Sequence, residues 1–495
     1  MDKGGDIVFS VLDWVVVAAV LVLLVLIGRW TARTNKTQSD YILGGKKMSS
    51  SLVGVSLFAA LFSSISYISY PGEMIKWGPV FLGGVLAFPV AGLLVGKFII
   101  PKLLAQNVSS AYEILEVKLG PGSRTLATVF FLALRFMWMC TVVYATVKVA
   151  LVPLISIPET LVPLVSIILV FVSVVYTTMG GLKAVLWTDA LHSSIMLIGA
   201  ILTIIVVLCT LPSFEGFKNT ELYANWTDWD WMPRMNKRMT VANVFLMSLF
   251  WQICTASSDQ MAIQRYISTG NARSAAKSYW VSLASSGLIQ VLLAIVGLMV
   301  MVWFSAYPEK MLSGTTVFGD ADSLFPRFVL VGLPRGVTGL IAAAIMAAAM
   351  SSLSSGLNSS ATVIQEDIIK KSKAFRNKSF TLTSIKLISA VLGVVVMCSC
   401  FLVGYVQGNL FDVTVKVVNL VVAPLAVLFF MALFVPKATD IGTVVGGLSA
   451  LAIAILIAFF QLFGITHLWV MPISLFVGMG VGIPVSRIHL IMKQQ

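Results

Sequence analysis

The chain has 495 residues, of which 58% are hydrophobic and 11% are charged, and its mean hydropathy is +0.95. This composition leaves too little polar surface to cover a water-soluble globule, so lipid must be the main solvent. The formal net charge of +13 would suit nucleic acid or acidic lipid, but the basic residues gather in alternate loops and report membrane topology instead. We therefore expect a protein of the lipid bilayer with no nucleic-acid partner.

Apolar runs of roughly 20 residues, the length that crosses a ~30 Å hydrocarbon core, recur along the whole chain with short breaks. The first run is longer than a signal-peptide core, so we expect it to stay as a helix. The sequence thus predicts an all-α polytopic membrane protein of about 13 transmembrane helices, with 1–495 as a single transmembrane domain. In chain order, the predicted spans are 9–30, 49–72, 79–104, 123–150, 159–179, 187–211, 241–263, 276–305, 335–363, 380–404, 410–434, 440–463 and 468–489.

Two basic loops predict the orientation, because cytoplasmic loops carry an excess of Lys and Arg. The loop after the first span holds Arg29, Arg33, Lys36, Lys46 and Lys47. The loop after the ninth span holds Lys370, Lys371, Lys373, Arg376 and Lys378. We therefore expect a multi-pass protein of the cell membrane with its N-terminus outside and its C-terminus in the cytoplasm.

The predicted spans at 49–72 and 241–263 interrupt their apolar runs with small hydroxyl residues near mid-membrane. Unwound backbone at this depth is tolerated only where it is buried or lines a cavity. These spans begin two blocks of five, at 49–211 and 241–434, and an odd number of helices gives the two blocks opposite topologies. That arrangement is typical of inverted-repeat transporters with a site at the midplane.

The ninth span carries the densest polar signal, in the sequence AAAMSSLSSGLNSS. Helical spacing aligns Ser351, Ser354, Ser355 and Asn358 on one face, with Ser352 and Ser359 at its edge. Small residues of this kind can form a seam for close helix packing. For the whole cluster we favour a site, because hydroxyl oxygens suit a hard cation and are costly in hydrocarbon without a partner.

Charged residues within the spans are the other candidates. Asp189 sits near one end of the sixth span, where it is either a helix N-cap or a functional acid, and Asp259 poses the same choice. Arg135 lies within the fourth span and either pairs internally or meets an anionic substrate. The three histidines are scattered, and neither a GxxxxGK[ST] loop nor an HExxH pair is present. We therefore predict a protein that is not an enzyme and has no cofactor.

Three motifs make the chain resemble the sodium:solute symporter family. GGLKAVLWTDALH, SSDQMAIQRYIS and AAAMSSLSSGLNSS occur in the family's order and spacing. The resemblance implies a single transporter domain with a five-plus-five inverted-repeat core. One helix, at 9–30, would precede this core, and two helices, at 440–489, would follow it. It also implies symport by alternating access, with sodium as the coupling ion.

The family's sodium sites transfer to this sequence by matching motifs. The ligands implied for the first sodium are the backbone carbonyls of Ala59, Phe62 and Ala348 with the hydroxyls of Ser351 and Ser352. The sialic acid carriers have a second site, whose implied ligands here are Asp189, Ser351, Ser354 and Ser355. We therefore expect two sodium ions in each transport cycle.

The implied substrate residues lie in the two interrupted spans and on the fourth span. They are Ser63, Ser64 and Ser66 in the first break, Gln252 and Thr255 in the second, and Arg135, which lies one turn before the position where the sialic acid carriers bind a carboxylate. A small organic anion is the first expectation, and a sugar or polyol is the alternative, although the sugar carriers' acidic residue corresponds to Val85 here. A membrane sensor and a passive channel are competing readings from other classes. The oligomeric state stays open.

Overall fold

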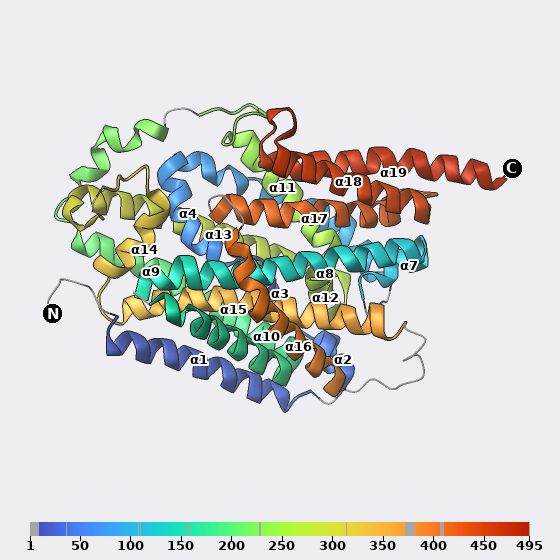
Figure 1. Ribbon diagram of the computed structural model, residues 1–495, viewed down its shortest axis with the longest axis horizontal. Coiled ribbons are helices and arrows are strands. Elements are labelled where there is room, and N and C mark those ends of the chain that lie inside the picture. The colour runs from blue at the N-terminus through green and yellow to red at the C-terminus, as the bar shows by residue number, and fades with distance from the viewer. Residues whose placement is uncertain are drawn as a thin grey trace.

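The computed structural model describes residues 9–494 except 36, 107, 109, 156–157, 227–228, 313, 372–381 and 406–409. Throughout these residues, every regular element is a helix, as the predicted fold class requires (Figure 1). The longest helices run along one common direction, and α1 and α19 lie at opposite edges of the bundle in this view. Of the residues used to predict orientation, Lys36, Lys373, Arg376 and Lys378 lie outside the described part.

The predicted spans map onto helices in chain order. Ten helices of the described residues are long and apolar enough to cross a membrane, and Ser50–Leu61 and Asn419–Phe434 are shorter apolar helices. One of the ten, Val162–Thr210, would be about 74 Å long if it were straight, more than twice the hydrocarbon thickness. Its backbone breaks at Gly181, where φ is 55° and ψ is −148°, so it supplies two spans.

The α-helices are α1 (Val11–Ala32), α2 (Gln38–Leu43), α3 (Ser50–Leu61), α4 (Ser64–Trp77), α5 (Ala87–Leu94), α6 (Ile100–Leu104), α7 (Glu113–Lys118), α8 (Pro121–Tyr144), α9 (Val152–Ile155), α10 (Val162–Thr210), α11 (Val241–Ser258), α12 (Gln260–Ser268), α13 (Ala272–Ala306), α14 (Ala321–Val331), α15 (Val337–Val363), α16 (Leu382–Ser399), α17 (Leu410–Phe434), α18 (Asp440–Phe460) and α19 (Val470–Gln494). Short 3-10 and π segments join or extend several of them. They include the turn Gly78–Gly84 between α4 and α5.

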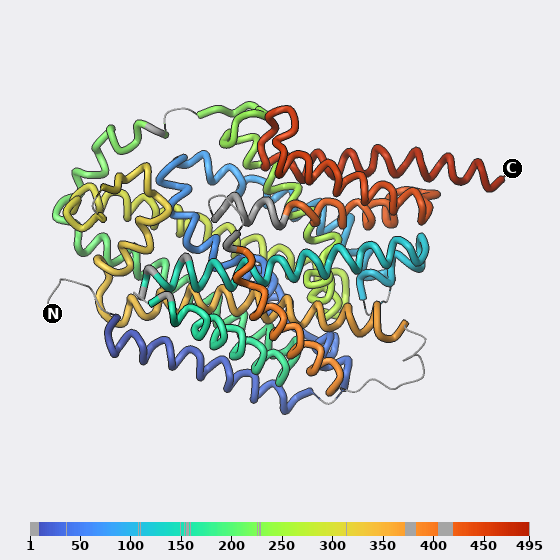
Figure 2. The backbone as a smooth tube through the Cα atoms, viewed as in Figure 1, coloured from blue at the N-terminus to red at the C-terminus, as the bar shows by residue number. Residues whose placement is uncertain are grey.

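Helix α15 is the core of the bundle. It packs against α1, α3, α8 and α10, and nearly all of its side chains are buried. Its tube runs along the bundle between those of α1 and α8 in Figure 2. The start of α15 is tied to α1 by Asp13, whose Oδ1 accepts hydrogen bonds from the amides of Gly336 and Gly339, both at 2.7 Å. The serine-rich face of this helix therefore lies inside the protein and away from lipid.

Helices α3 and α4 form one span that is broken where the sequence predicts. Phe62 and Ser63 have extended backbone, with φ/ψ of −94°/115° and −99°/166°. The Ser63 hydroxyl caps α4 by accepting from the amide of Ser66 at 3.4 Å. The break leaves backbone carbonyls at the end of α3 inside the protein rather than in a helical ladder.

Helices α11 and α12 form the second broken span, but their break falls at Asp259, where φ/ψ is −80°/120°. Gln252 and Thr255 stay helical in α11, so the expectation that they occupy the break is wrong. The physical reason is capping: Asp259 Oδ1 accepts from the amide of Met261 at 2.9 Å and starts α12. Asp189, in contrast, lies within the second half of α10, so it is not an N-cap.

Candidate functional site

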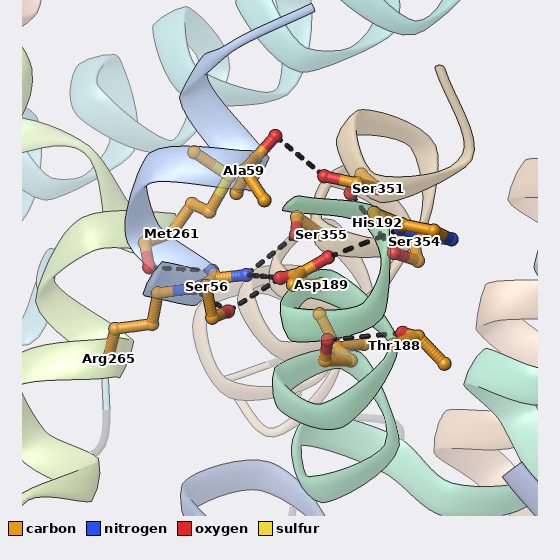
Figure 3. A network of polar contacts seen from close by, with 12 residues as sticks. Ser56, Ala59, Thr188, Asp189, His192, Met261, Arg265, Ser351, Ser354 and Ser355 are labelled. Atoms are coloured by element: carbon orange, nitrogen blue, oxygen red, sulfur yellow. Dashed lines mark hydrogen bonds and ion pairs between the residues drawn. The ribbon is translucent and has the colours of Figure 1, made fainter. Parts of the chain in front are cut away.

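The broken end of α3 meets the serine-rich face of α15. Ser351 Oγ donates a hydrogen bond to the carbonyl of Ala59 at 2.6 Å, and Ser352 Oγ lies 3.5 Å from the carbonyl of Ala60. Figure 3 shows the Ala59–Ser351 contact bridging the two helices. Ala348 is one turn away on α15, and it is fully buried. The structure thus brings carbonyl and hydroxyl oxygens of two different helices together in a place closed to solvent.

A second polar network lies one turn further toward the C-terminal end of α15 and is built around a buried arginine of α12. The Arg265 Nη2 atom is 3.0 Å from Asp189 Oδ2 and 2.7 Å from Ser355 Oγ. Its Nε donates to Ser56 Oγ at 2.9 Å, and Ser56 Oγ donates to Asp189 Oδ2 at 2.5 Å. Figure 3 shows this guanidinium reaching Asp189 and Ser355 together. One cation thereby ties α12 to α3, α10 and α15.

Arg265 is hydrogen-bonded to two of the four ligands expected for the second sodium, Asp189 and Ser355. The other two have different partners, since Ser351 contacts Ala59 and Ser354 Oγ donates to the carbonyl of Ser351 at 3.0 Å. The Asp189 Oδ1 atom accepts no hydrogen bond within the described residues. This oxygen instead lies 4.0 Å from Nδ1 of the buried His192.

Sequence reasoning missed Arg265 because the predicted span ended at residue 263. The structure continues α12 to Ser268, which carries Arg265 inside the protein with 1% of its surface exposed. A longer span would have placed an arginine at membrane depth, where an ionisable residue is a functional candidate by default.

A cavity of about 170 Å³ lies between the two broken spans and α5, α8, α13 and α17. Four of the expected substrate residues line it, and two do not. Ser66, Arg135, Gln252 and Thr255 face the cavity. Ser64 Oγ is instead hydrogen-bonded to Thr146 Oγ1 at 2.6 Å, and Ser63 caps α4. The break in the first span thus directs only one of its three serines into the cavity.

Aromatic rings and amides complete the cavity wall. Tyr70, Phe81, Phe88, Trp138 and Trp251 contribute rings. The Tyr70 and Phe81 rings pack edge to face with centroids 4.9 Å apart. A solute in this space would therefore meet large apolar faces together with a few polar groups, which is the usual make-up of a small-molecule site.

The charged groups of the cavity form a pair. Arg135 of α8 makes an ion pair with Asp259, the residue at the break between α11 and α12. Both side chains are buried, and both line the cavity. The Arg135 guanidinium also lies 5.6 Å from the centre of the Phe131 ring, within range of a cation–π contact. Arg135 therefore pairs internally and lines the cavity at the same time.

Helix α12 is anchored at the end of the bundle that carries α2 and α7. The Gln260 side-chain oxygen accepts from the amide of Ala111 at 2.7 Å, and Gln264 Nε2 donates to the carbonyl of Ile42 at 2.7 Å. Nearby, hydrogen bonding to Lys371 and the charge of Arg124 hold the pKa of Glu116 below its usual value. The hydrogen bonds of Gln260 and Gln264 tie α12 to α2 and to the segment just before α7.

The family model for the "Sodium:solute symporter family" matches residues 41–450. The chain belongs to the sodium:solute symporter family. Among its curated relatives, the sodium/sialic acid symporter SiaT of Proteus mirabilis is 28% identical over 466 residues, covering 91% of this chain and 90% of the relative. The sodium-coupled monocarboxylate transporter 1 of Mus musculus is 28% identical over 468 residues, covering 92% and 74%. Sodium-coupled solute symport is therefore the activity of this chain, and it is not an enzyme.

Solved structures agree with the fold of this symporter. A substrate-bound, outward-open sodium-coupled sialic acid symporter superposes with a TM-score of 0.84 at 25% identity, covering 97% of this chain and 98% of that one. The nucleobase-cation-symport-1 family transporter Mhp1 in a closed conformation gives a TM-score of 0.57 at 13% identity, covering 91% and 95%, so it supports the fold alone. The predicted inverted-repeat fold class is confirmed, whereas the residue bounds of its two repeats stay a prediction.

Proposed function

We propose that this symporter imports a small organic anion together with sodium by alternating access. One observation carries the choice of an anion: the Arg135 guanidinium lines the cavity between the two broken spans. A guanidinium is suited to carboxylates because its planar donors match the two oxygens. The names of two relatives, which refer to sialic acid and to monocarboxylates, point to the same class of solute.

The first sodium is proposed to bind where α3 meets α15. Its ligands would be the carbonyls of Ala59, Phe62 and Ala348 with the hydroxyls of Ser351 and Ser352. Support comes from the close approach of Ser351 to the Ala59 carbonyl, because two oxygens 2.6 Å apart need little movement to face one cation. Neutral ligands cancel none of the ion's charge. Because the ligands come from both α3 and α15, bound sodium would bridge the two helices and favour the conformation in which they lie together.

A second sodium is proposed at Asp189, Ser351, Ser354 and Ser355, and its entry would require Arg265 to move. A sodium ion and a guanidinium that share one carboxylate repel each other strongly in a site closed to water. The Asp189 Oδ1 atom, which accepts no hydrogen bond within the described residues and lies 4.0 Å from His192 Nδ1, would offer the ion a first contact. The expected two sodium ions in each cycle therefore depend on this exchange of cations.

A neutral sugar or polyol is the second candidate solute, and the charge balance of the cavity favours it. Asp259 neutralises Arg135, and the amides of Gln252, Gln290 and Asn419 offer donors and acceptors to hydroxyl groups. These amides would bind a neutral solute without any net charge. The choice between an anion and a sugar therefore depends on whether the solute forms an ion pair with Arg135.

The predicted orientation, with the N-terminus outside and the C-terminus in the cytoplasm of a cell-membrane protein, is retained as part of the proposal. It rests on Lys46, Lys47, Lys370 and Lys371, which lie at one end of the helices together with α2 and the end of α15. Labelling of single introduced cysteines at either end of the bundle in intact cells would test it.

The proposed function is tested by uptake into proteoliposomes that hold the purified symporter. Radiolabelled lactate or benzoate is offered with an inward sodium gradient, or with the same gradient of potassium. Uptake of a carboxylate that requires sodium and is not inhibited by excess glucose or mannitol supports the anion. Uptake of the sugar alone, in the same gradient, would replace the first candidate by the second.

A further inference from the structure

Asp259 serves two elements with its two carboxylate oxygens. Its Oδ1 atom accepts from the Met261 amide at 2.9 Å and caps α12, whereas its Oδ2 atom pairs with Arg135 of α8 across the cavity. The residue also forms the extended break between α11 and α12. The charge that faces the solute is therefore attached to the hinge of a broken span.

A solute carboxylate and Asp259 would compete for Arg135. The two side chains of the pair expose only 6% and 2% of their surfaces, so neither charge is well solvated by water. A second carboxylate in this space would leave one uncompensated negative charge, and like charges at short range repel strongly in a low dielectric. The cavity can hold an anion at low cost only if one of the two carboxylates withdraws from the guanidinium.

We propose that Asp259 is an internal partner of Arg135 that an anionic solute replaces, and that this replacement releases α8 from the hinge between α11 and α12. The inference rests on the proposed anion transport. Before binding, the pair joins two elements across the cavity. After binding, the solute holds Arg135 instead, while Asp259 Oδ1 continues to cap α12. The negative charge of the solute then lies near the start of α12, the helix that also carries Arg265.

This arrangement differs from a fixed pair in one measurable way. If Asp259 competes with the solute, neutralising it must strengthen the binding of carboxylates and leave uncharged analogues unaffected. If the pair only holds the cavity in shape, its loss weakens the binding of both kinds of solute. If Asp259 instead meets a positive group of the solute, its loss weakens binding of a zwitterion above all.

The test uses Asp259→Asn in the full-length symporter. Asparagine caps helices about as well as aspartate, so α12 keeps its start while the competing charge is removed. Binding is measured by thermal shift and by calorimetry in sodium buffer, with lactate, benzoate and nicotinate and with the matched amides lactamide, benzamide and nicotinamide. Asp259→Ser is a second neutral variant that retains a capping hydroxyl, in case the first does not fold. Asp230→Asn, on a polar connection where the carboxylate pairs with Arg234, is the matched control.

The expected result is carboxylate binding about tenfold tighter or more in the Asp259 variants, since close charge pairs in buried settings couple by at least that factor. Amide binding and the control variant should match the wild-type protein. Carboxylate binding that is unchanged or weaker in folded variants, with the wild type binding carboxylates in sodium, overturns this inference alone. A wild-type protein that binds none of the carboxylates overturns the proposed anion transport and this inference with it.

Discussion

Ser352 is the most informative single side chain to remove, because it is a proposed ligand of the first sodium only. Its hydroxyl lies 3.5 Å from the Ala60 carbonyl, at the outer limit of a hydrogen bond. The Ser352→Ala change therefore removes almost no contact from the folded protein. Any large effect on sodium must come from the lost ligand.

The expected magnitude follows from the chemistry of one neutral ligand. A hydrogen bond or dipole contact to a charged group contributes about 1.5–3 kcal/mol. A loss of this size corresponds to roughly 10- to 150-fold in sodium affinity. We expect the sodium concentration for half-maximal uptake to rise by at least the lower factor, with little change in thermal stability without sodium.

The assay measures solute uptake into proteoliposomes over a range of external sodium concentrations, together with the thermal unfolding midpoint of the purified variant. Ser360→Ala is the matched control. It lies on the same helix, its side chain is buried, and its hydroxyl has no hydrogen-bond partner within the described residues. A half-maximal sodium concentration that is the same for wild type, Ser352→Ala and Ser360→Ala would remove Ser352 from the sodium site.

Three further changes test separate parts of the structure. Arg265→Lys replaces a forked guanidinium by a point charge that cannot hold Ser56, Asp189 and Ser355 together. Sodium would then displace the weaker cation more easily, so direct binding of radioactive sodium should tighten several-fold. Weaker sodium binding would argue against the exchange of Arg265 for sodium at Asp189. Arg135→Lys should weaken lactate binding roughly tenfold in calorimetry through loss of the two-point contact while sparing lactamide, and equal losses for both would assign Arg135 a purely structural role. Gly181→Ala should lower the unfolding midpoint by the equivalent of about 1–3 kcal/mol. The reason is that φ is +55° and the new Cβ would lie 2.5 Å from a backbone oxygen. Gly480→Ala, whose Cβ would enter open space, should leave the midpoint unchanged.

Much of the fold follows from the sequence because apolar run length and helical spacing are local properties. The polar face around Ser351 and Ser355 lies inside the bundle as the spacing of three and four residues indicates. The first break was also visible in the sequence, since a cluster of small hydroxyl residues in an apolar run cannot stay in contact with lipid. These predictions needed no knowledge of which helices touch.

The remaining features depend on contacts between distant segments. Whether Ser63 and Ser64 face the cavity is decided by capping and by Thr146, which lies on another helix. The second break is set by Asp259, for which the sequence leaves both a helix cap and a functional acid open. Its ion pair with Arg135 of α8 becomes visible only in the folded protein. The sequence did not reveal Arg265, because polar residues normally mark the end of a span. In the structure the chain continues past them as the buried helix α12.

The most direct test of sodium-coupled anion transport is counterflow and gradient-driven uptake by the purified symporter in one set of proteoliposomes. With lactate or benzoate inside and out, an inward sodium gradient should drive accumulation of the labelled carboxylate above its external concentration. Collapse of that gradient with a sodium ionophore should abolish the accumulation. Carboxylate entry that proceeds equally with sodium or potassium, and never exceeds equilibrium, would contradict the account.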